Sequence, residues 1–180
     1  MAILPIFQHP NKDDILRKKS VEAFDLKEAE KISKNLIDTL NNSKIPGAGL
    51  SAPQIGINKR IFIARKFFNE DENNSNYIDY IIINPILKNK PKEKTKSLEA
   101  CLSIDDAYGF VERYKKVGIV YTNLDGKKQI LKTGGFLSCV IQHELDHLNG
   151  ILFIDKLIDN KIYTEKEIDA MYKKKEVKAE

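Results

Sequence analysis

The sequence predicts a single domain of the α+β class, in which antiparallel β-sheets pack around a central helix that carries an HExxH motif. An N-terminal helix and a C-terminal helix complete the prediction. Short β-rich segments with tight turns occupy the middle of the chain, and helical patterns flank them. The 180 residues suffice for one hydrophobic core. We therefore expect one domain over residues 1–180, with about residues 173–180 as a frayed tail.

The first long helix is expected at about residues 26–41. Asp25 and Glu28 have the spacing of a capping box, and apolar residues then recur every three or four positions. The segment PGAGLSAPQIG, residues 46–56, follows this helix. Its glycines and prolines are incompatible with a regular element, so we expect a shaped loop or a bulged sheet edge there.

Strands are expected at residues 60–65, 80–85, 117–123 and 129–133, where β-branched and aromatic residues concentrate. The polar stretch of residues 69–76 and the lysine-rich stretch of residues 88–96 have the composition of solvated loops. Asp125 and Gly126 lie between the last two strands and predict a hairpin, which makes that strand pair antiparallel.

A mostly apolar helix is expected over residues 136–148, and the Asn-Gly pair that follows supplies its stop signal. Its apolar composition predicts a central position in the molecule. Thr164 and Glu167 form a second capping box, which opens a helix near the end of the chain.

Composition and charge exclude several classes of function. The chain has 30 basic and 26 acidic residues, a net charge of +4, but only four arginines, and its lysines are dispersed. Sequence-specific DNA-binding proteins depend on arginine forks and clustered positive charge, so no DNA partner is expected. No apolar run approaches the roughly 20 residues that span a bilayer, and the first residues lack the basic start of a signal peptide. We therefore expect a cytoplasmic protein, without membrane contact, whose two cysteines are reduced.

The motif H-E-L-D-H, from His143 to His147, carries the clearest chemical signal. Residues four apart lie on one face of a helix, so both imidazoles can bind one metal ion. Glu144 is rotated by about 100° from His143 and can flank the metal as a general base without binding it. Two histidines can also be ordinary core residues. Burying two histidines, a glutamate and an aspartate on so apolar a helix is unfavourable, however, so we expect these side chains to have a function.

A catalytic metal site needs a third protein ligand and an open coordination position. Cys139 lies eight residues before His147, about 12 Å of helix rise, so these two cannot share a metal ion, and Cys139 suits a small core residue. The candidates that remain are Cys101, on a separate segment, and the downstream carboxylates of Asp155, Glu165 and Glu167.

Three motifs together resemble the peptide deformylase family. They are Gly-Ala-Gly-Leu-Ser-Ala-Pro-Gln at residues 47–54, Glu-Ala-Cys-Leu-Ser at residues 99–103 and Gln-His-Glu-Leu-Asp-His at residues 142–147. They occur in the order of the family, and the similarity runs from the HPNKDDILRKKS opening to the last helix. The resemblance implies a metal-dependent hydrolase that removes the N-formyl group from the initiator methionine of nascent polypeptides and releases formate.

The resemblance also implies roles for individual residues. Glu144 would act as acid and base, while the side-chain amide of Gln54 and the backbone N–H of Leu102 would bind the oxygen that becomes negative. Such donors typically contribute about 3 kcal/mol each. One thiolate and two imidazoles would hold the metal, those of Cys101, His143 and His147. The substrate would contact residues of these motifs and of the helix before His143, namely Ala48, Gly49, Glu99, Ala100, Phe136, Cys139 and Val140.

Phe136 and Val140 lie seven and three residues before His143, on the same face of the predicted helix. They can line an apolar pocket for the methionine side chain, or they can pack in the core as apolar residues at this spacing usually do. Because the formyl group is small, we expect a narrow site that accepts only a hydrogen on the attacked carbonyl and excludes ordinary peptide bonds.

The resemblance implies one Fe²⁺ per chain, with Zn²⁺ or Ni²⁺ able to substitute, although the donor set alone suits zinc. The partners it implies are N-formylmethionyl nascent peptides. The basic end of the last helix, residues 173–178, could contact ribosomal RNA or remain solvated. We expect a monomer.

Departures from the family pattern concern the substrate cleft. Ala100 replaces a glycine, which predicts a backbone that avoids positive φ or carries strain. Asp-Asp-Ala-Tyr at residues 105–108 replaces the proline and arginine common in that region, whereas Arg113 matches a second arginine. Ser51 replaces a common alanine. Two alternatives therefore stay open: an HExxH endopeptidase with a downstream carboxylate ligand, and a relative that binds peptide or ribosome without turnover.

Overall fold

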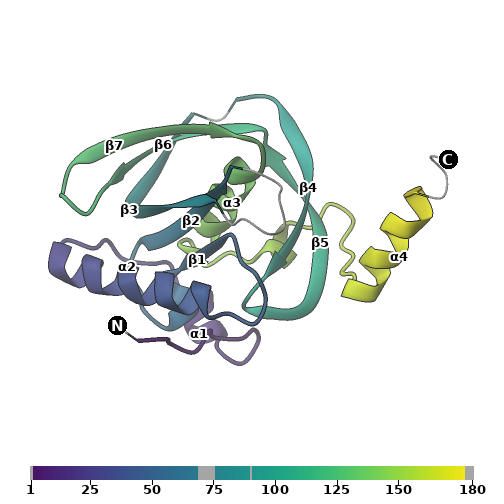
Figure 1. Cartoon of the computed structure of the whole chain (residues 1–180), viewed down its shortest axis with the longest axis horizontal. Helices are drawn as coiled ribbons and strands as arrows, with labels where there is room; N and C mark the ends of the chain where they lie inside the picture. Colours follow the sequence, from purple (N-terminus) through teal and green to yellow (C-terminus); the bar gives the residue numbers. More distant parts are fainter. Residues whose placement is uncertain (1, 69–75, 90, 177–180) are drawn as a thin grey trace.

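The computed structural model describes residues 2–68, 76–89 and 91–176, and it shows antiparallel sheets around a central helix (Figure 1). Five strands form one sheet in the order β1-β2-β3-β6-β7, and β4 pairs with β5 in a second sheet. The strands are β1 Gly49–Ser51, β2 Ile61–Phe67, β3 Tyr77–Asn89, β4 Lys94–Cys101, β5 Ile104–Tyr114, β6 Lys116–Thr122 and β7 Lys128–Gly134. The predicted α+β fold class is confirmed.

Helices connect and cover these strands. They are α1 Asp13–Leu16, α2 Leu26–Asn41, the 3-10 helix η1 Ala52–Ile55, α3 Gly135–His147, the 3-10 helix η2 Phe153–Lys156 and α4 Glu165–Glu176. Asp25 caps α2 by accepting hydrogen bonds from the backbone N–H groups of Lys27 and Glu28. Among the helices described here, none is long and apolar enough to cross a membrane.

Strand β2 of the five-stranded sheet is buried on both faces over its first residues. α2 packs against one face through a cluster that includes Ile61 and Ile63 of β2, and α3 packs against the other through Phe62 and Ala64. Successive side chains of a strand point to opposite faces, so a strand covered on both sides must be apolar at every position. This explains the continuous apolar run at the start of β2.

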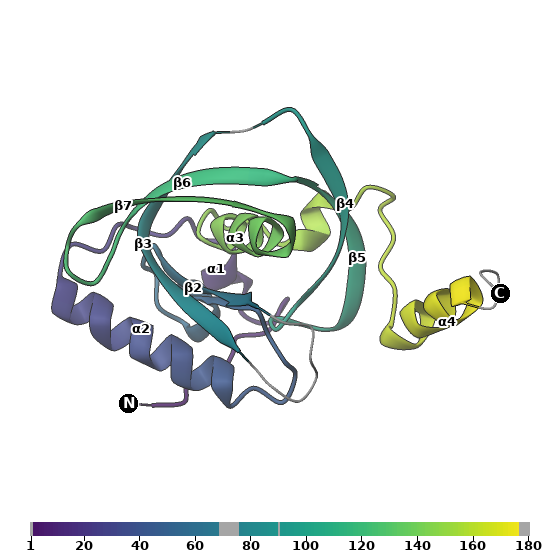
Figure 2. The same cartoon turned by 45° about the horizontal axis from the view of Figure 1, so that its top comes forward.

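Helix α3 is enclosed by strands of both sheets (Figure 2). It contacts β1, β2, β6 and β7 of the larger sheet and β5 of the smaller one. The end of β4 is held near α3 by a separate apolar cluster in which Cys101 packs with Ala107, Val111 and Phe153. Two segments far apart in the chain, the end of β4 and the HExxH helix, therefore meet in the interior.

Several elements differ from the sequence-based expectations. Within residues 46–56, Gly49–Ser51 form β1 at the edge of the sheet, as one alternative expected, but Ala52–Ile55 form the unexpected helix η1, which is capped by Gly56 with a φ of +81°. In the lysine-rich stretch of residues 88–96, residues 88–89 end β3 and residues 94–96 begin β4, so the expected turn is shorter than predicted and includes residues 91–93. β4 and β5 are rich in charged residues because one face is exposed, so cross-strand pairing outweighs their weak β-propensity. Most of the other expected polar loop, residues 69–75, lies outside the described residues.

Helix α4 projects from the rest of the fold beside β5 (Figures 1 and 2). The segment before it is joined to β5 by paired backbone hydrogen bonds between Tyr108 and Tyr163. The tail expected to fray from residue 173 is helical through Glu176, and residues 177–180 lie outside the described part of the chain.

Candidate active site

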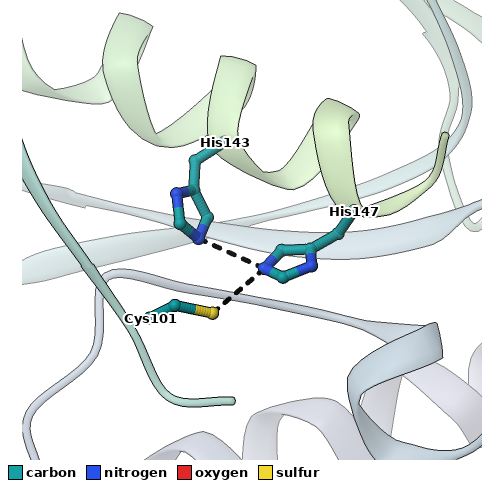
Figure 3. Close-up of side chains that lie close together, drawn as sticks. All are labelled: Cys101, His143 and His147. Atoms are coloured by element: carbon teal, nitrogen blue, oxygen red, sulfur yellow. Dashed lines mark hydrogen bonds between the residues drawn. The ribbon is translucent and has the colours of Figure 1, made fainter. Parts of the chain in front are cut away.

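Cys101, His143 and His147 meet between the end of β4 and one face of α3 (Figure 3). The Sγ atom of Cys101 lies 3.3 Å from Nε2 of His147, which lies 3.2 Å from Nε2 of His143. All three potential ligand atoms lie within 4.8 Å of one another. A tetrahedral metal ion with bonds of about 2.0 Å to nitrogen and 2.3 Å to sulfur keeps such donors about 3.3–3.6 Å apart. These three residues, the ligand cluster, therefore fit one metal ion with little rearrangement.

The downstream carboxylates lie outside the ligand cluster. Asp155 pairs instead with Arg17 at 2.8 Å, and Glu165 and Glu167 belong to the first turn of α4. Within the described ranges of the chain, no carboxylate completes a group of potential metal ligands with the two histidines. The geometry thus favours Cys101 as the third ligand.

Glu144 lies beside the ligand cluster without belonging to it. Its side chain is buried, and Oε2 has no hydrogen-bond partner among the residues that the structure describes. Burial raises the pKa of Glu144 to about 7. A Cβ atom on Gly49 would lie only 2.5 Å from Oε1 of this carboxylate, so the close approach of β1 requires glycine. A carboxyl group with a pKa near neutrality can accept and return a proton at physiological pH.

The side chain of Gln54 is held in one orientation by hydrogen bonds on both sides. Its Oε1 accepts from the backbone N–H of Ser51 at 2.9 Å and from the Ser51 hydroxyl at 2.8 Å. A backbone N–H can only donate, so the amide oxygen must face Ser51. The amide nitrogen then points toward Cys101 Sγ, at 3.6 Å, and Ser103 Oγ, at 3.2 Å. Gln54 therefore presents a donor at the ligand cluster.

A buried network of charges lies behind His143. Nδ1 of His143 is 3.0 Å from Oε2 of Glu99, and Arg113 donates to both Glu99 oxygens at 2.7 and 2.8 Å. Burial opposes the charge of Glu99, but the hydrogen bonds from Arg113 and His143 lower its pKa to about 2. Arg113 also binds Asp146, which pairs with Lys156 at 2.6 Å. The carboxylate of Glu99, expected to contact substrate, is thus engaged in orienting an imidazole.

A cleft of about 240 Å³ adjoins the ligand cluster. Phe136 is exposed in its wall, whereas Val140 and Cys139 are buried. Cys139, whose spacing suggests a core residue, is therefore also part of the lining. The expected site residues that line the cleft are Ala48, Gly49, Gln54, Glu99, Ala100, Cys101, Leu102, Phe136, Cys139, Val140, His143 and Glu144.

The rim expected at residues 105–108 does line the cleft through Asp106, Ala107 and Tyr108, but sequence reasoning missed Ser97, Leu98 and Ile104 of β4 and β5. No local pattern marks these residues, because the strand pairing that brings them to the cleft is not local. Ala100 itself pairs with Tyr108 in this ladder, and its φ is not positive. The alanine that replaces the family's glycine is therefore accommodated without backbone strain.

A family model described as polypeptide deformylase matches residues 3–162. The chain belongs to the peptide deformylase family. The peptide deformylase of Helicobacter hepaticus is 42% identical over 159 residues, which are 87% of this chain and 84% of that relative. The peptide deformylase of Pelagibacter ubique is 38% identical over 158 residues, 87% of each chain.

Solved peptide deformylase structures agree with this assignment. The crystal structure of the Thermotoga maritima enzyme has a TM-score of 0.75 at 29% identity and covers 87% of this chain and 99% of its own. A Plasmodium falciparum peptide deformylase has a TM-score of 0.74 at 37% identity, with coverages of 84% and 85%. The predicted enzyme class, a hydrolase that removes the N-formyl group from nascent peptides, is confirmed. The endopeptidase alternative required a downstream carboxylate ligand, which the ligand cluster does not contain.

Proposed function

We propose that this chain removes the formyl group with Glu144 as the acid and base and with Gln54 and the backbone N–H of Leu102 as donors to the carbonyl oxygen. The metal ligands in this proposal are Cys101, His143 and His147. The observation that carries it is the position of Glu144, whose buried carboxyl, with a pKa of about 7, lines the same cleft as the ligand cluster.

The proposed metal is Fe²⁺, one ion per chain, and Zn²⁺ or Ni²⁺ can take its place. One thiolate and two imidazoles leave a coordination position for a water molecule or the substrate. When bound, the metal polarises the formyl oxygen and lowers the pKa of a water molecule to about 7. Because Nδ1 of His143 is engaged by Glu99, Nε2 is the nitrogen of His143 that would bind the ion.

Glu144 transfers the proton: it accepts a proton from the attacking water and donates it to the departing amine. The C–N bond of the formamide breaks, so the products are formate and a free N-terminal amine. The N–H of Gln54 donates to the formyl oxygen as negative charge develops there, a contribution of about 3 kcal/mol. Ser51 keeps this donor in place because it occupies the oxygen of the same amide.

Phe136 and Val140 form part of an apolar wall for the methionine side chain, and Ala48, Gly49, Ala100 and Cys139 complete its surroundings. We further propose that residues 1–180 act as one domain and that the protein is a cytoplasmic monomer. Helix α4 projects from the fold and includes Lys173, and the basic composition of residues 173–178 in the sequence suits a contact with ribosomal RNA. Cosedimentation with ribosomes that declines as salt rises would support this contact, and cosedimentation independent of salt would contradict it.

The primary test is formate release from formyl-Met-Ala-Ser by protein purified without oxygen and loaded with Fe²⁺ or Ni²⁺. We expect release from this peptide and none from its acetylated analogue, because the site excludes a methyl group on the attacked carbonyl. Absence of release from metal-loaded protein would overturn the proposed function. Metal analysis of the protein purified without oxygen tests the assignment of Fe²⁺.

Two substitutions test the assigned roles. Glu144→Ala should abolish turnover while the protein retains its metal, because the residue moves a proton and does not bind the ion. Cys101→Ser should reduce the metal content, whereas Cys139→Ser, at a buried cysteine outside the ligand cluster, should leave it unchanged. Full turnover by Glu144→Ala, or full metal content in Cys101→Ser, would refute the corresponding role.

A further inference from the structure

The ladder between β4 and β5 is interrupted at the rim of the cleft. Cys101 pairs with Ile104, but Ala100 pairs with Tyr108, so residues 105–107 have no partner on β4. A bulge of this kind bends the strand and redirects its side chains. At its centre, Asp106 has a φ of +44°, a left-handed conformation that aspartate tolerates better than most residues. The carboxylate of Asp106 therefore lies at a position where a regular hairpin would have a residue paired with β4.

Asp106 lines the same cleft as Glu144 and the ligand cluster. Its side chain is exposed, and its Oδ1 accepts a hydrogen bond from the backbone N–H of Glu165 at 2.9 Å. The described residues include no ion pair to Asp106. The lining of the cleft contains no lysine or arginine, and its other carboxylates, those of Glu99 and Glu144, are buried. Asp106 is therefore the uncompensated charge of the lining.

Acidic residues of α4 reinforce this charge. Beside the bulge, Tyr108 has a pKa raised by partial burial and then by three negative charges, those of Glu165, Asp106 and Asp169. Lys161 is close to the same carboxylates. It lowers the pKa of Glu167, whereas the negative charge of Asp106 raises that pKa. Asp106 thus lines the mouth of the cleft with the carboxylates of Glu165 and Asp169 near enough to act on the same tyrosine. We call the side chains of Asp106, Glu165 and Asp169 the acidic rim.

We propose that Asp106 is a specificity-determining residue, which favours formylated peptides with lysine or arginine directly after the methionine or one position later. The inference rests on the proposed function, in which the ligand cluster and the apolar wall receive the formyl group and the methionine. The rest of the peptide must then leave past the cleft lining. A cationic side chain meets the acidic rim favourably, while an acidic side chain is repelled.

The test compares kcat/KM for formyl-Met-Lys-Ser and formyl-Met-Ser-Lys with the corresponding glutamate peptides. We expect lysine to exceed glutamate by about three- to ten-fold in at least one position at low salt. Because the contact is exposed, the ratio should fall toward unity at about 0.5 M salt. Asp106→Asn should reduce the same ratio to less than about two-fold.

The matched control is Asp125→Asn, which removes one negative charge from the turn between β6 and β7, outside the cleft lining. It should retain the lysine preference of the unaltered protein. Equal kcat/KM for lysine and glutamate at both positions, or a preference that survives in Asp106→Asn, would overturn the proposal. Turnover of formyl-Met-Ala-Ser by the unaltered protein reports on the deformylase activity separately.

Discussion

Replacing Arg113 with methionine should destabilise the protein by about 3–5 kcal/mol, because two buried carboxylates lose their shared cation. The Arg113 side chain is 3% exposed and binds both Glu99 and Asp146. Methionine retains much of the apolar stem but none of the hydrogen-bond donors. Glu99 would keep its contact with His143, and Asp146 its pairing with Lys156. Neither of these contacts replaces the bidentate arginine.

The magnitude follows from this burial. Removing one partner of a buried ion pair costs about 3–5 kcal/mol, whereas exposed pairs contribute about 0–1 kcal/mol. For a domain of this size, each kcal/mol lowers Tm by about 2–4 °C, so Arg113→Met should lower Tm by about 6–20 °C. His143 also loses part of its support through Glu99, and we expect metal affinity to fall by about 10-fold or more.

The assay is thermal unfolding followed by circular dichroism, with metal-loaded and with chelated protein. Chelation separates the loss of the ion network from the loss of metal binding. Arg17→Met is the matched control, because Arg17 pairs with Asp13 and Asp155 at a partly exposed site. It should cost less than about 1 kcal/mol. Equal Tm changes for the two variants in chelated protein would refute the reasoning.

Three further predictions concern pH, backbone conformation and the orientation of the amide donor. Glu99 has a folded pKa of about 2, below its ordinary 4.5, so its stabilisation of about 3 kcal/mol is present above pH 4.5 and is lost as pH falls toward 2. Urea unfolding at several pH values should therefore show a shallower acid destabilisation in Glu99→Gln, and parallel curves would contradict this. Gly150→Ala should lower the free energy of unfolding more than Gly135→Ala does in the same assay. Both glycines have a positive φ, which costs about 1–2 kcal/mol for alanine. Only at Gly150 would the added Cβ overlap a backbone carbonyl, that of Arg17. Equal losses would be evidence against that overlap. Ser51→Ala removes one of two donors to the amide oxygen of Gln54, so kcat should fall by about 3–10-fold with KM unchanged, and an unaltered kcat would show that the hydroxyl does not position the amide.

Local signals in the sequence were enough for the three longer helices, α2, α3 and α4, and for the chemical type of the site, but not for α1, η1 and η2. Asp25 caps α2 where the capping pattern places it, and the turn at Asp125 and Gly126 joins β6 and β7. The HExxH spacing alone brings His143 and His147 to one face of α3, because a helix repeats every 3.6 residues. These features depend on residues within a few positions of one another, so the pattern contains the information that determines them.

Contacts between distant segments could be decided only by the tertiary structure. Cys101 and His147 are 46 residues apart, and their contact depends on the ladder of β4 with β5 and on the apolar packing around η2. The same ladder brings Glu99 to His143, and the hydrogen bonds from Ser51 direct the Gln54 amide nitrogen toward Cys101. The sequence by itself therefore determined the three longer helices and the donor chemistry. Residue spacing alone left Cys101 and the downstream carboxylates open as the third ligand, and the family resemblance implied Cys101. Only the tertiary structure shows Cys101 beside the two histidines, because strand pairing and core packing bring together segments that are far apart in the sequence.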